Sequence, residues 1–331
     1  NNPCRSGPVV AVDGKPSAVK VRQLQRRLWA AAKQSQGRRF HALFDRIHRG
    51  DVLWEAWERV RKNRGAAGVD RVTLAFVEEE YGVERLLAEL QQDLRSGSYR
   101  PAPARRVDIP KPAGGVRPLG IPTVRDRVAQ AAAKIVLEPV FEADFVSVSF
   151  GFRPKRSALQ AKETIRTAFI AGFTQVAEAD IRGFFDHLDH DRLMGLVALR
   201  VSDRRVLKLV GQWLQAGVLT AEGLQRSVAG TPQGGVISPL LANIYLHAFD
   251  VEVARRGLGV LVRYADDFVI MTRTPQQAGA ALDAAREILG SWGLELHPGK
   301  TRIVDLREGR EGFDFLGCHF RARMSGRLRS S

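Results

Sequence analysis

Two adjacent carboxylates, Asp266 and Asp267, lie between two short apolar runs and are the side chains of this sequence most suggestive of chemistry. Residues 260–263 and 268–271 are rich in β-branched and aromatic side chains, which is typical of strands, and the segment between them has turn chemistry. The pattern predicts a hairpin with its acids at the tip. On spacing alone, such a pair is either a solvated turn or part of a metal site, and both interpretations stay open.

A third acid, Asp180, ends a strand-like run over residues 174–180. Mg²⁺ prefers hard oxygen ligands and usually takes one or two protein carboxylates, which leaves positions for water and phosphate oxygens. In a two-metal phosphoryl transfer, ions about 3.5–4 Å apart stabilise both the attacking and the leaving oxygen. Such a site needs carboxylates where strands converge, so the strand of Asp180 is expected near the hairpin.

The composition indicates a folded protein with a basic surplus. The chain of 331 residues is long enough for two or more domains, and 44% of its residues are hydrophobic, enough to fill ordinary cores. Its 51 Lys and Arg against 36 Asp and Glu give a net charge of +15. Most of the surplus lies in the first 120 residues. It favours a polyanionic partner, with nucleic acid as the leading candidate and an anionic membrane surface as the alternative.

The remaining features of the composition bear on the cellular location of the protein. No run of about 18 apolar residues and no signal-peptide pattern occurs in the sequence, so neither a membrane span nor secretion is expected. Cys4 and Cys318 make no disulfide framework or zinc cluster. A cytoplasmic location is therefore the expectation, with no membrane partner.

Helical periodicity predicts several helices that should position these acids. Residues 21–33 form a basic amphipathic pattern, whose polar face is either simply solvated or turned toward RNA. A helix with leucines at 86, 87, 90 and 94 should stop near Gly97, and another should end or kink near Pro139. The expected helix starts are Asp51, Thr123, Ser157, Ser202, Ser238 and Thr274.

Residues 105–122 predict two extended runs that meet at a glycine turn, and their prolines favour an edge ribbon over a central sheet. Lys111 and Arg117 flank that turn. Such a pair is either two solvated cations or a clamp for a triphosphate. Residues 301–305 and 313–320 are expected to be short strands.

Taken together, these segments resemble a known family. Tyr264-Ala265-Asp266-Asp267 resembles the catalytic motif of reverse transcriptases, and the nearest resemblance is to the bacterial group II intron-encoded reverse transcriptase/maturase. The resemblance covers roughly residues 50–320, and several motifs in order are more specific than any one of them. The other similar blocks are residues 65–70, 117–122, 151–154, 180–186, 230–240, 296–301 and 313–317.

This resemblance implies an α+β, right-hand polymerase fold, with fingers plus a palm whose antiparallel catalytic sheet is backed by helices. The implied division is an N-terminal arm and basic helix over residues 1–34, fingers over 35–153 and 188–236, and a palm over 154–187 and 237–331. The thumb/maturase and endonuclease domains are expected to be absent.

The resemblance also implies a metal site. Asp180, Asp266 and Asp267 would be catalytic. Asp180 and Asp266 would bind two Mg²⁺ ions, for which Mn²⁺ can substitute, and the backbone carbonyl of Ile181 would complete a site. Asp267 would be the supporting acid.

A nucleotide site is implied beside it. Lys111 and Arg117 would hold the incoming triphosphate, Gln233 would contact the nucleotide or the template, and Lys300 would position or protonate the leaving pyrophosphate. Phe185 would be a steric gate that excludes a 2′-hydroxyl, and a buried core phenylalanine is the alternative.

The implied function is that of an RNA-directed DNA polymerase, which adds dNTPs to the 3′-hydroxyl of a DNA primer on an RNA template. Structured intron RNA is a further expected partner, in splicing and mobility, and a homodimer is possible. The alternatives are an RNA-binding splicing cofactor without polymerase activity and a CRISPR-associated reverse transcriptase. A structural hairpin protein with accidental acids would leave Phe185, Gln233 and Lys300 unexplained.

Overall fold

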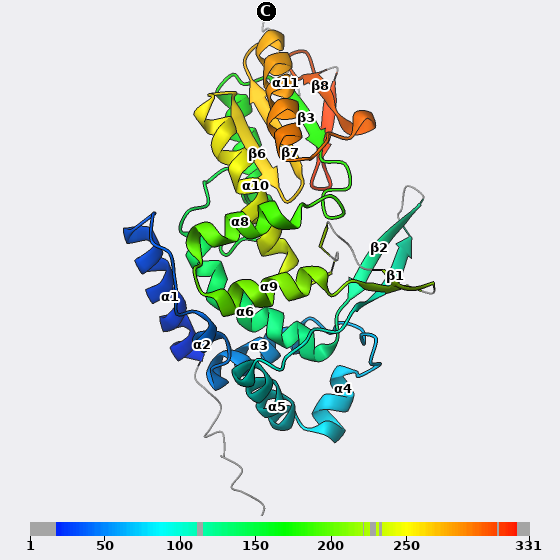
Figure 1. Cartoon of the computed structure of the whole chain (residues 1–331). Coiled ribbons are helices and arrows are strands. Elements are labelled where there is room, and N and C mark those ends of the chain that lie inside the picture. Colours follow the sequence, from blue (N-terminus) through cyan, green and yellow to red (C-terminus); the bar gives the residue numbers. More distant parts are fainter. Residues whose placement is uncertain are drawn as a thin grey trace, which may run out of the picture.

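A computed structural model shows an antiparallel sheet next to a helical part from which a β-ribbon projects (Figure 1). The structure describes residues 18–110, 115–220, 222–225, 230–231, 234–309 and 311–322. The sheet has four strands in the order β6-β7-β3-β8. Their bounds are β3 Gln175–Asp180, β6 Val260–Tyr264, β7 Asp267–Thr272 and β8 Arg302–Asp305.

Helices cover both faces of this sheet. The helices are α7 Ala158–Ile170, α10 Ser238–Arg255 and α11 Pro275–Ser291. Phe268 and Ile270 of β7 join the core that contains α10 and α11, whereas Val269 and Met271 join the core that contains α7. Because successive side chains of a strand point to opposite faces, a strand buried on both sides is a continuous apolar run. The prediction of an α+β fold with a helix-backed antiparallel sheet is confirmed.

The helical part is organised around α6 Val124–Glu142, which is buried on nearly all sides. It contacts α1 Ala18–Gln34, α2 Phe44–Ile47, α3 Gly50–Lys62 and α5 Val83–Ser96. Pro139 lies in the last turn of α6, which ends three residues later at Glu142, so the predicted end near this proline is confirmed. None of the helices in the described ranges is long and apolar enough to cross a membrane.

Two short elements, α4 Leu74–Phe76 and η1 Val77–Tyr81, lie between α3 and α5. Two further helices, α8 His190–Arg200 and α9 Arg204–Gln215, complete the helical part. The helix ending near Gly97 is confirmed, since this residue takes a left-handed φ of 75° just after α5. A glycine adopts that conformation without the steric cost that other residues bear.

A β-ribbon projects from the helical part at the right of Figure 1. Its strands β1 Ala104–Pro110 and β2 Val116–Ile121 pair antiparallel, as the sequence predicts, with Arg117 opposite Ile109. Two further strands, β4 Val218–Thr220 and β5 Gly223–Gln225, extend the ribbon into a four-stranded sheet in the order β2-β1-β4-β5. The sequence did not predict these additional strands.

The prediction of a single strand over residues 313–320 is wrong, because these residues form a hairpin of two strands. Strands β9 Gly312–Phe315 and β10 Cys318–Arg321 are joined by Leu316 and Gly317, whose φ angles are 51° and 70°. Positive φ at both loop residues is the geometry that matches the twist of paired strands. The apolar character of the run conceals this turn.

Three predicted helix starts are also corrected. Asp51 lies in the first turn of α3 after Arg49, and Ser238 is the first residue of α10 after Ile237. Asp203, not Ser202, caps α9. The caps at Thr123, Ser157 and Thr274 are confirmed.

Asp203 caps the start of α9 and also binds the start of α2. Its Oδ1 accepts from the backbone N–H of Arg205 at 3.1 Å, and its Oδ2 accepts from Leu43 at 3.0 Å and Phe44 at 2.9 Å. Only 4% of its surface is exposed. One buried carboxylate therefore ties the start of α9 to the start of α2, which is distant in sequence.

Substituting this carboxylate tests its role. We expect Asp203→Ala to lower the free energy of unfolding by about 2–4 kcal/mol, because a cap is lost and buried N–H groups lose their acceptor. Ser202→Ala is the matched control and should change it by less than about 0.5 kcal/mol. Urea denaturation followed by circular dichroism measures both. Equal effects would contradict the assignment of the cap.

Candidate active site

Three carboxylates meet at one end of the antiparallel sheet β6-β7-β3-β8. Asp180, the last residue of β3, lies directly opposite Asp267, the first residue of β7. Tyr264 also pairs with Asp267, so Ala265 and Asp266 form a two-residue loop between β6 and β7. Side chains directly opposite each other on antiparallel strands share a face. The predicted hairpin with acids at its tip and its convergence with Asp180 are confirmed.

The segment after α11 holds the end of β3 in place. His297 donates its N–H to the carbonyl of Asp180 at 2.8 Å, and Arg182 donates to the carbonyl of Glu295 at 2.8 Å. These two bonds make a bridge between Ile181 and Leu296. In this pattern the backbone groups of Ile181 point away from the bridge. Its carbonyl is thereby kept out of this pairing, as its predicted role as a metal ligand requires.

Lys300 reaches the carboxylates from the same segment. It ends the short helix η2 Pro298–Lys300, in which the N–H of Gly299 donates to the Nδ1 atom of His297. Its Nζ forms a salt bridge with Oδ2 of Asp180, which raises the pKa of Lys300. The structure thus places Lys300 beside the acids, and its predicted role toward the leaving pyrophosphate stays a prediction.

Negative charge exceeds positive charge at this edge of the sheet. Burial, followed by the charge of Asp180, raises the pKa of Asp266. Burial, followed by the charges of Asp266 and Asp180, raises the pKa of Asp267 to about 6. Asp267 keeps an exposed surface, so water still solvates its charge. The two neighbouring carboxylates disfavour a further negative charge and thereby also raise its pKa. A bound cation would relieve this repulsion.

The donor set fits Mg²⁺. Within the described residues, no three His, Cys, Asp or Glu side chains are gathered closely enough to hold an ion between them. A Mg²⁺ site needs fewer, because one or two carboxylates plus water and phosphate oxygens fill its octahedron. Asp180, Asp266 and the Ile181 carbonyl supply oxygen ligands of this hard kind.

Arg117 approaches the site from the ribbon. Its charge lowers the pKa of both Asp266 and Asp267, against the larger effects that raise them. Strand β2 therefore directs a cation toward the hairpin tip. Lys111 and Gln233, the other predicted nucleotide contacts in this region, lie outside the described residues.

Comparison with known proteins decides the family. Residues 109–320 match the model of the reverse transcriptase (RNA-dependent DNA polymerase) family. The chain belongs to this family. It is 36% identical over 339 residues to protein YkfC of Escherichia coli (strain K12), covering 90% of this chain and 87% of that protein.

Further relatives refine the position of this reverse transcriptase. It is 40% identical over 215 residues to the group II intron-encoded protein LtrA of Lactococcus lactis subsp. cremoris, covering 64% of this chain and 35% of that protein. The chain thus spans about a third of LtrA. A telomerase structure from Candida albicans shares the fold with a TM-score of 0.50 and 15% identity, covering 68% of this chain and 46% of that chain. The predicted right-hand polymerase fold and the resemblance to intron-encoded reverse transcriptases are confirmed.

Phe185 is buried in the reverse transcriptase core. Only 8% of its surface is exposed, and its ring packs edge-to-face on Phe184 with centroids 5.2 Å apart. Its carbonyl accepts from the N–H of Thr231 at 2.8 Å. The glycine-rich block at residues 230–240 is therefore docked on the predicted steric gate. Both interpretations of Phe185, gate and core residue, remain compatible with this position.

The same block also contacts the ribbon. A Cβ atom added to Gly234, whose φ is 110°, would lie 2.7 Å from the carbonyl oxygen of Gly120 in β2. Thr231 thus lies against the segment of Phe185, and Gly234 lies against the ribbon.

The sequence analysis missed the residues that support the hairpin tip from behind. They are Arg263, Asp250, Asn243 and Gly151, which form a buried hydrogen-bonded cluster. A signal exists in the sequence, since Arg263 interrupts an apolar strand and Asp250 interrupts an apolar helix. Charges in such positions are seldom buried without a partner.

The raised pKa of Asp267 predicts a pH dependence of stability. An aspartate of the unfolded chain titrates near 3.9, and the folded value is about 6. Ionisation is therefore more costly in the folded state, so stability falls as pH rises from about 4 to about 6 and stays reduced above that. Solvent contact at Asp267 makes the effect modest.

Asp267→Asn removes this ionisation. In EDTA, the melting temperature of the variant relative to the parent should rise between pH 4 and pH 7.5. Asp283→Asn, at an exposed carboxylate on α11, is the control and should show no such change. Differential scanning calorimetry at both pH values measures this. A constant difference for Asp267→Asn would refute the raised pKa.

Proposed function

We propose that this reverse transcriptase adds deoxynucleotides to a primer 3′-hydroxyl on an RNA template, with two Mg²⁺ ions at the sheet edge. The main support is the convergence of Asp180, Asp266 and Asp267, at a place where burial and the neighbouring carboxylates raise the pKa of Asp267 despite Lys300 and Arg117. A polymerase needs such a site to hold metal and triphosphate together.

When bound, Mg²⁺ supplies electrostatic stabilisation to the attacking and leaving oxygens, and Mn²⁺ can substitute. Asp180, Asp266 and the Ile181 carbonyl hold the metal in this proposal, and Asp267 supports them. The protein needs no nucleophilic side chain, because positioning and charge stabilisation suffice for phosphoryl transfer.

Lys300 has two successive partners in this proposal. Without metal, its ammonium neutralises Asp180. If Asp180 held a metal ion, the Lys300 ammonium would be able to face the departing pyrophosphate instead. Arg117 and Lys111 would bind the other phosphate oxygens, because Arg suits forked contacts and Lys point contacts. Gln233 would contact the base or template.

The domain division follows the same logic. We propose fingers over residues 35–153 and 188–236 and a palm over 154–187 and 237–331. The support is that the ribbon brings Arg117 toward carboxylates of the four-stranded sheet. The incoming nucleotide would then lie between the two parts.

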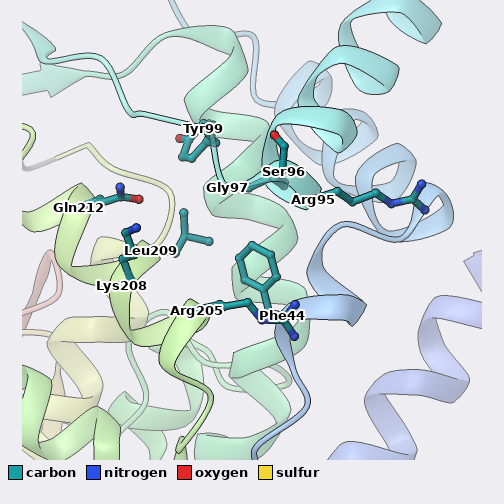
Figure 2. A pocket seen from close by; sticks show the side chains of 10 residues that line it. Phe44, Arg95, Ser96, Gly97, Tyr99, Arg205, Lys208, Leu209 and Gln212 are labelled. Atoms are coloured by element: carbon teal, nitrogen blue, oxygen red, sulfur yellow. The ribbon is translucent and has the colours of Figure 1, made fainter.

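Basic surfaces of the helical part support RNA as a partner. Arg22, Arg26 and Arg27 are exposed on α1, opposite its buried face. A pocket of about 200 Å³ lies where α5 ends near α9, and Figure 2 shows Arg95, Arg205 and Lys208 around it. Lys and Arg contacts to phosphates dominate affinity for nucleic acid. Binding of structured intron RNA is proposed by kinship with LtrA.

Primer extension tests the polymerase proposal. Extension of a DNA primer on an RNA template with dNTPs should require Mg²⁺ and fall at least about a hundredfold in Asp266→Ala, because a metal ligand is lost. Asp283→Ala on α11 is the control and should keep the activity of the parent. Tight RNA binding without extension by the parent would favour an RNA-binding splicing cofactor instead.

A second assay tests Phe185. If its ring packs against the sugar, Phe185→Ala should reduce the preference for dNTPs over ribonucleotides on the order of tenfold or more. Phe184→Leu, which alters the adjacent buried ring, is the control for loss of packing. Competition between dNTP and rNTP in single-turnover extension measures the preference. An unchanged preference in a folded Phe185→Ala would leave Phe185 as a core residue.

A further inference from the structure

A buried ion pair lies directly behind the hairpin tip. The guanidinium of Arg263 on β6 donates from Nε and Nη2 to the two carboxylate oxygens of Asp250 on α10, both at 2.6 Å. The side chains of both residues are 1% exposed. The pair thus connects the β6–β7 hairpin to α10, a helix that is buried along most of its length.

The same guanidinium also binds the loop that carries Asp266. Its Nη1 donates to the carbonyl of Ala265 at 2.8 Å and to Oδ1 of Asn243 at 3.2 Å. Ala265 is one of the two loop residues and has a φ of 59°, which L-residues rarely adopt. The hydrogen bond from Arg263 therefore holds a strained backbone immediately before a predicted metal ligand.

A second layer fixes the loop from the side. Asn243 donates from Nδ2 to the carbonyl of Gly151 at 2.8 Å. A Cβ atom on Gly151 would lie 2.5 Å from the backbone nitrogen of Ala265, so the two backbones are in direct contact. The N–H of Phe150 donates to Arg263, whose own N–H donates to Val148, both at 2.9 Å.

Stability alone does not account for this arrangement. Moving two charges out of water is costly, and a well-packed apolar pair of similar volume often stabilises a core as much or more. What the charged fork adds is direction, since it reaches four acceptor atoms on three residues at fixed angles. Lysine at this position would keep the charge but could not bind Asp250 in a bidentate way and Ala265 together.

We infer that Arg263 is a positioning residue for metal binding: held by Asp250 and Asn243, it fixes the Ala265 carbonyl and so the direction of the Asp266 carboxylate. This inference rests on the proposed function, because it takes Asp266 as a metal ligand. Residues that orient ligands in this way typically change metal affinity by 10–100-fold when substituted.

The test measures metal binding separately from polymerisation. The full chain, without nucleotide or primer, is titrated with Mn²⁺ while electron paramagnetic resonance reports free Mn²⁺. The variants are Arg263→Lys, the apolar pair R263M/D250L, and Asn243→Ala. Asp266→Ala gives the baseline for binding away from the site, and thermal unfolding in EDTA reports folding.

Arg200→Lys is the matched control. Arg200 is also buried and forms a salt bridge with Asp144 at 2.6 Å, but it lies on α8 and contacts the carbonyls of Ala32 and Gln36. A merely structural role of Arg263 would make Arg263→Lys resemble Arg200→Lys, with a lower melting temperature and unchanged Mn²⁺ affinity.

We expect R263M/D250L to fold with a melting temperature near the parent's and to bind Mn²⁺ on the order of tenfold more weakly. Asn243→Ala should show a smaller loss in the same direction. The Mg²⁺ concentration for half-maximal primer extension should rise in parallel. Should Arg263→Lys fail to fold, the other two variants decide the question.

Unchanged Mn²⁺ affinity in folded R263M/D250L and Asn243→Ala would overturn the inference. So would equal Mn²⁺ binding by the parent and Asp266→Ala, because then no metal binds at the tip. If the parent binds Mn²⁺ through Asp266 but extends no primer, the proposed polymerase function fails, while the comparison of affinities still decides the role of Arg263.

Discussion

Repulsion among three carboxylates is the constraint around which this molecule is built. Asp180, Asp266 and Asp267 gather at one sheet edge although each charge disfavours the others. On a flexible segment of chain, the three carboxylates would move apart. They stay together because β3 and β7 pair over six residues in fixed register and both faces of that pair are buried in apolar cores. A one-residue slip would move every side chain to the wrong face.

Cations around the acids then differ in how firmly they are held. Arg263 is enclosed and bound to four acceptor atoms, so its position is part of the core. Lys300 contacts Asp180 from an exposed helical turn and can exchange that partner for another anion. Arg117 extends from a ribbon whose outer residues are exposed. Arg263 is thus fixed within the core, whereas Lys300 and Arg117 lie at the surface beside the acids.

Local signals in the sequence account for much of this. The Asp266 hairpin and the ribbon around Arg117 are predictable because strand composition and turn residues lie next to each other in the chain. The motifs that resemble reverse transcriptases supply the order of the remaining blocks, and the family match confirms that resemblance. Periodicity alone would not have located Asp180 beside Asp267, since convergence is a property of the sheet.

Long-range partners account for the failures. Ser202 and Asp203 are both good caps by local preference, and the choice depends on Leu43 and Phe44, which need the carboxylate of Asp203. The cluster at Arg263 depends likewise on Asn243 in another element and on the close approach of Gly151. No window of sequence contains both partners.

Helix α10 gives these separate parts a common support. It contacts α6, α8, β6 and α11, and it carries both Asp250 and Asn243. The helix is buried along most of its length, so it cannot shift without repacking the cores on either side. The ribbon, by contrast, is joined to the helical part through few buried residues. If a ligand required Arg117 and the acids to approach each other, movement of the ribbon would therefore disturb less buried packing than movement of the acids, which lie on a hairpin packed against α10.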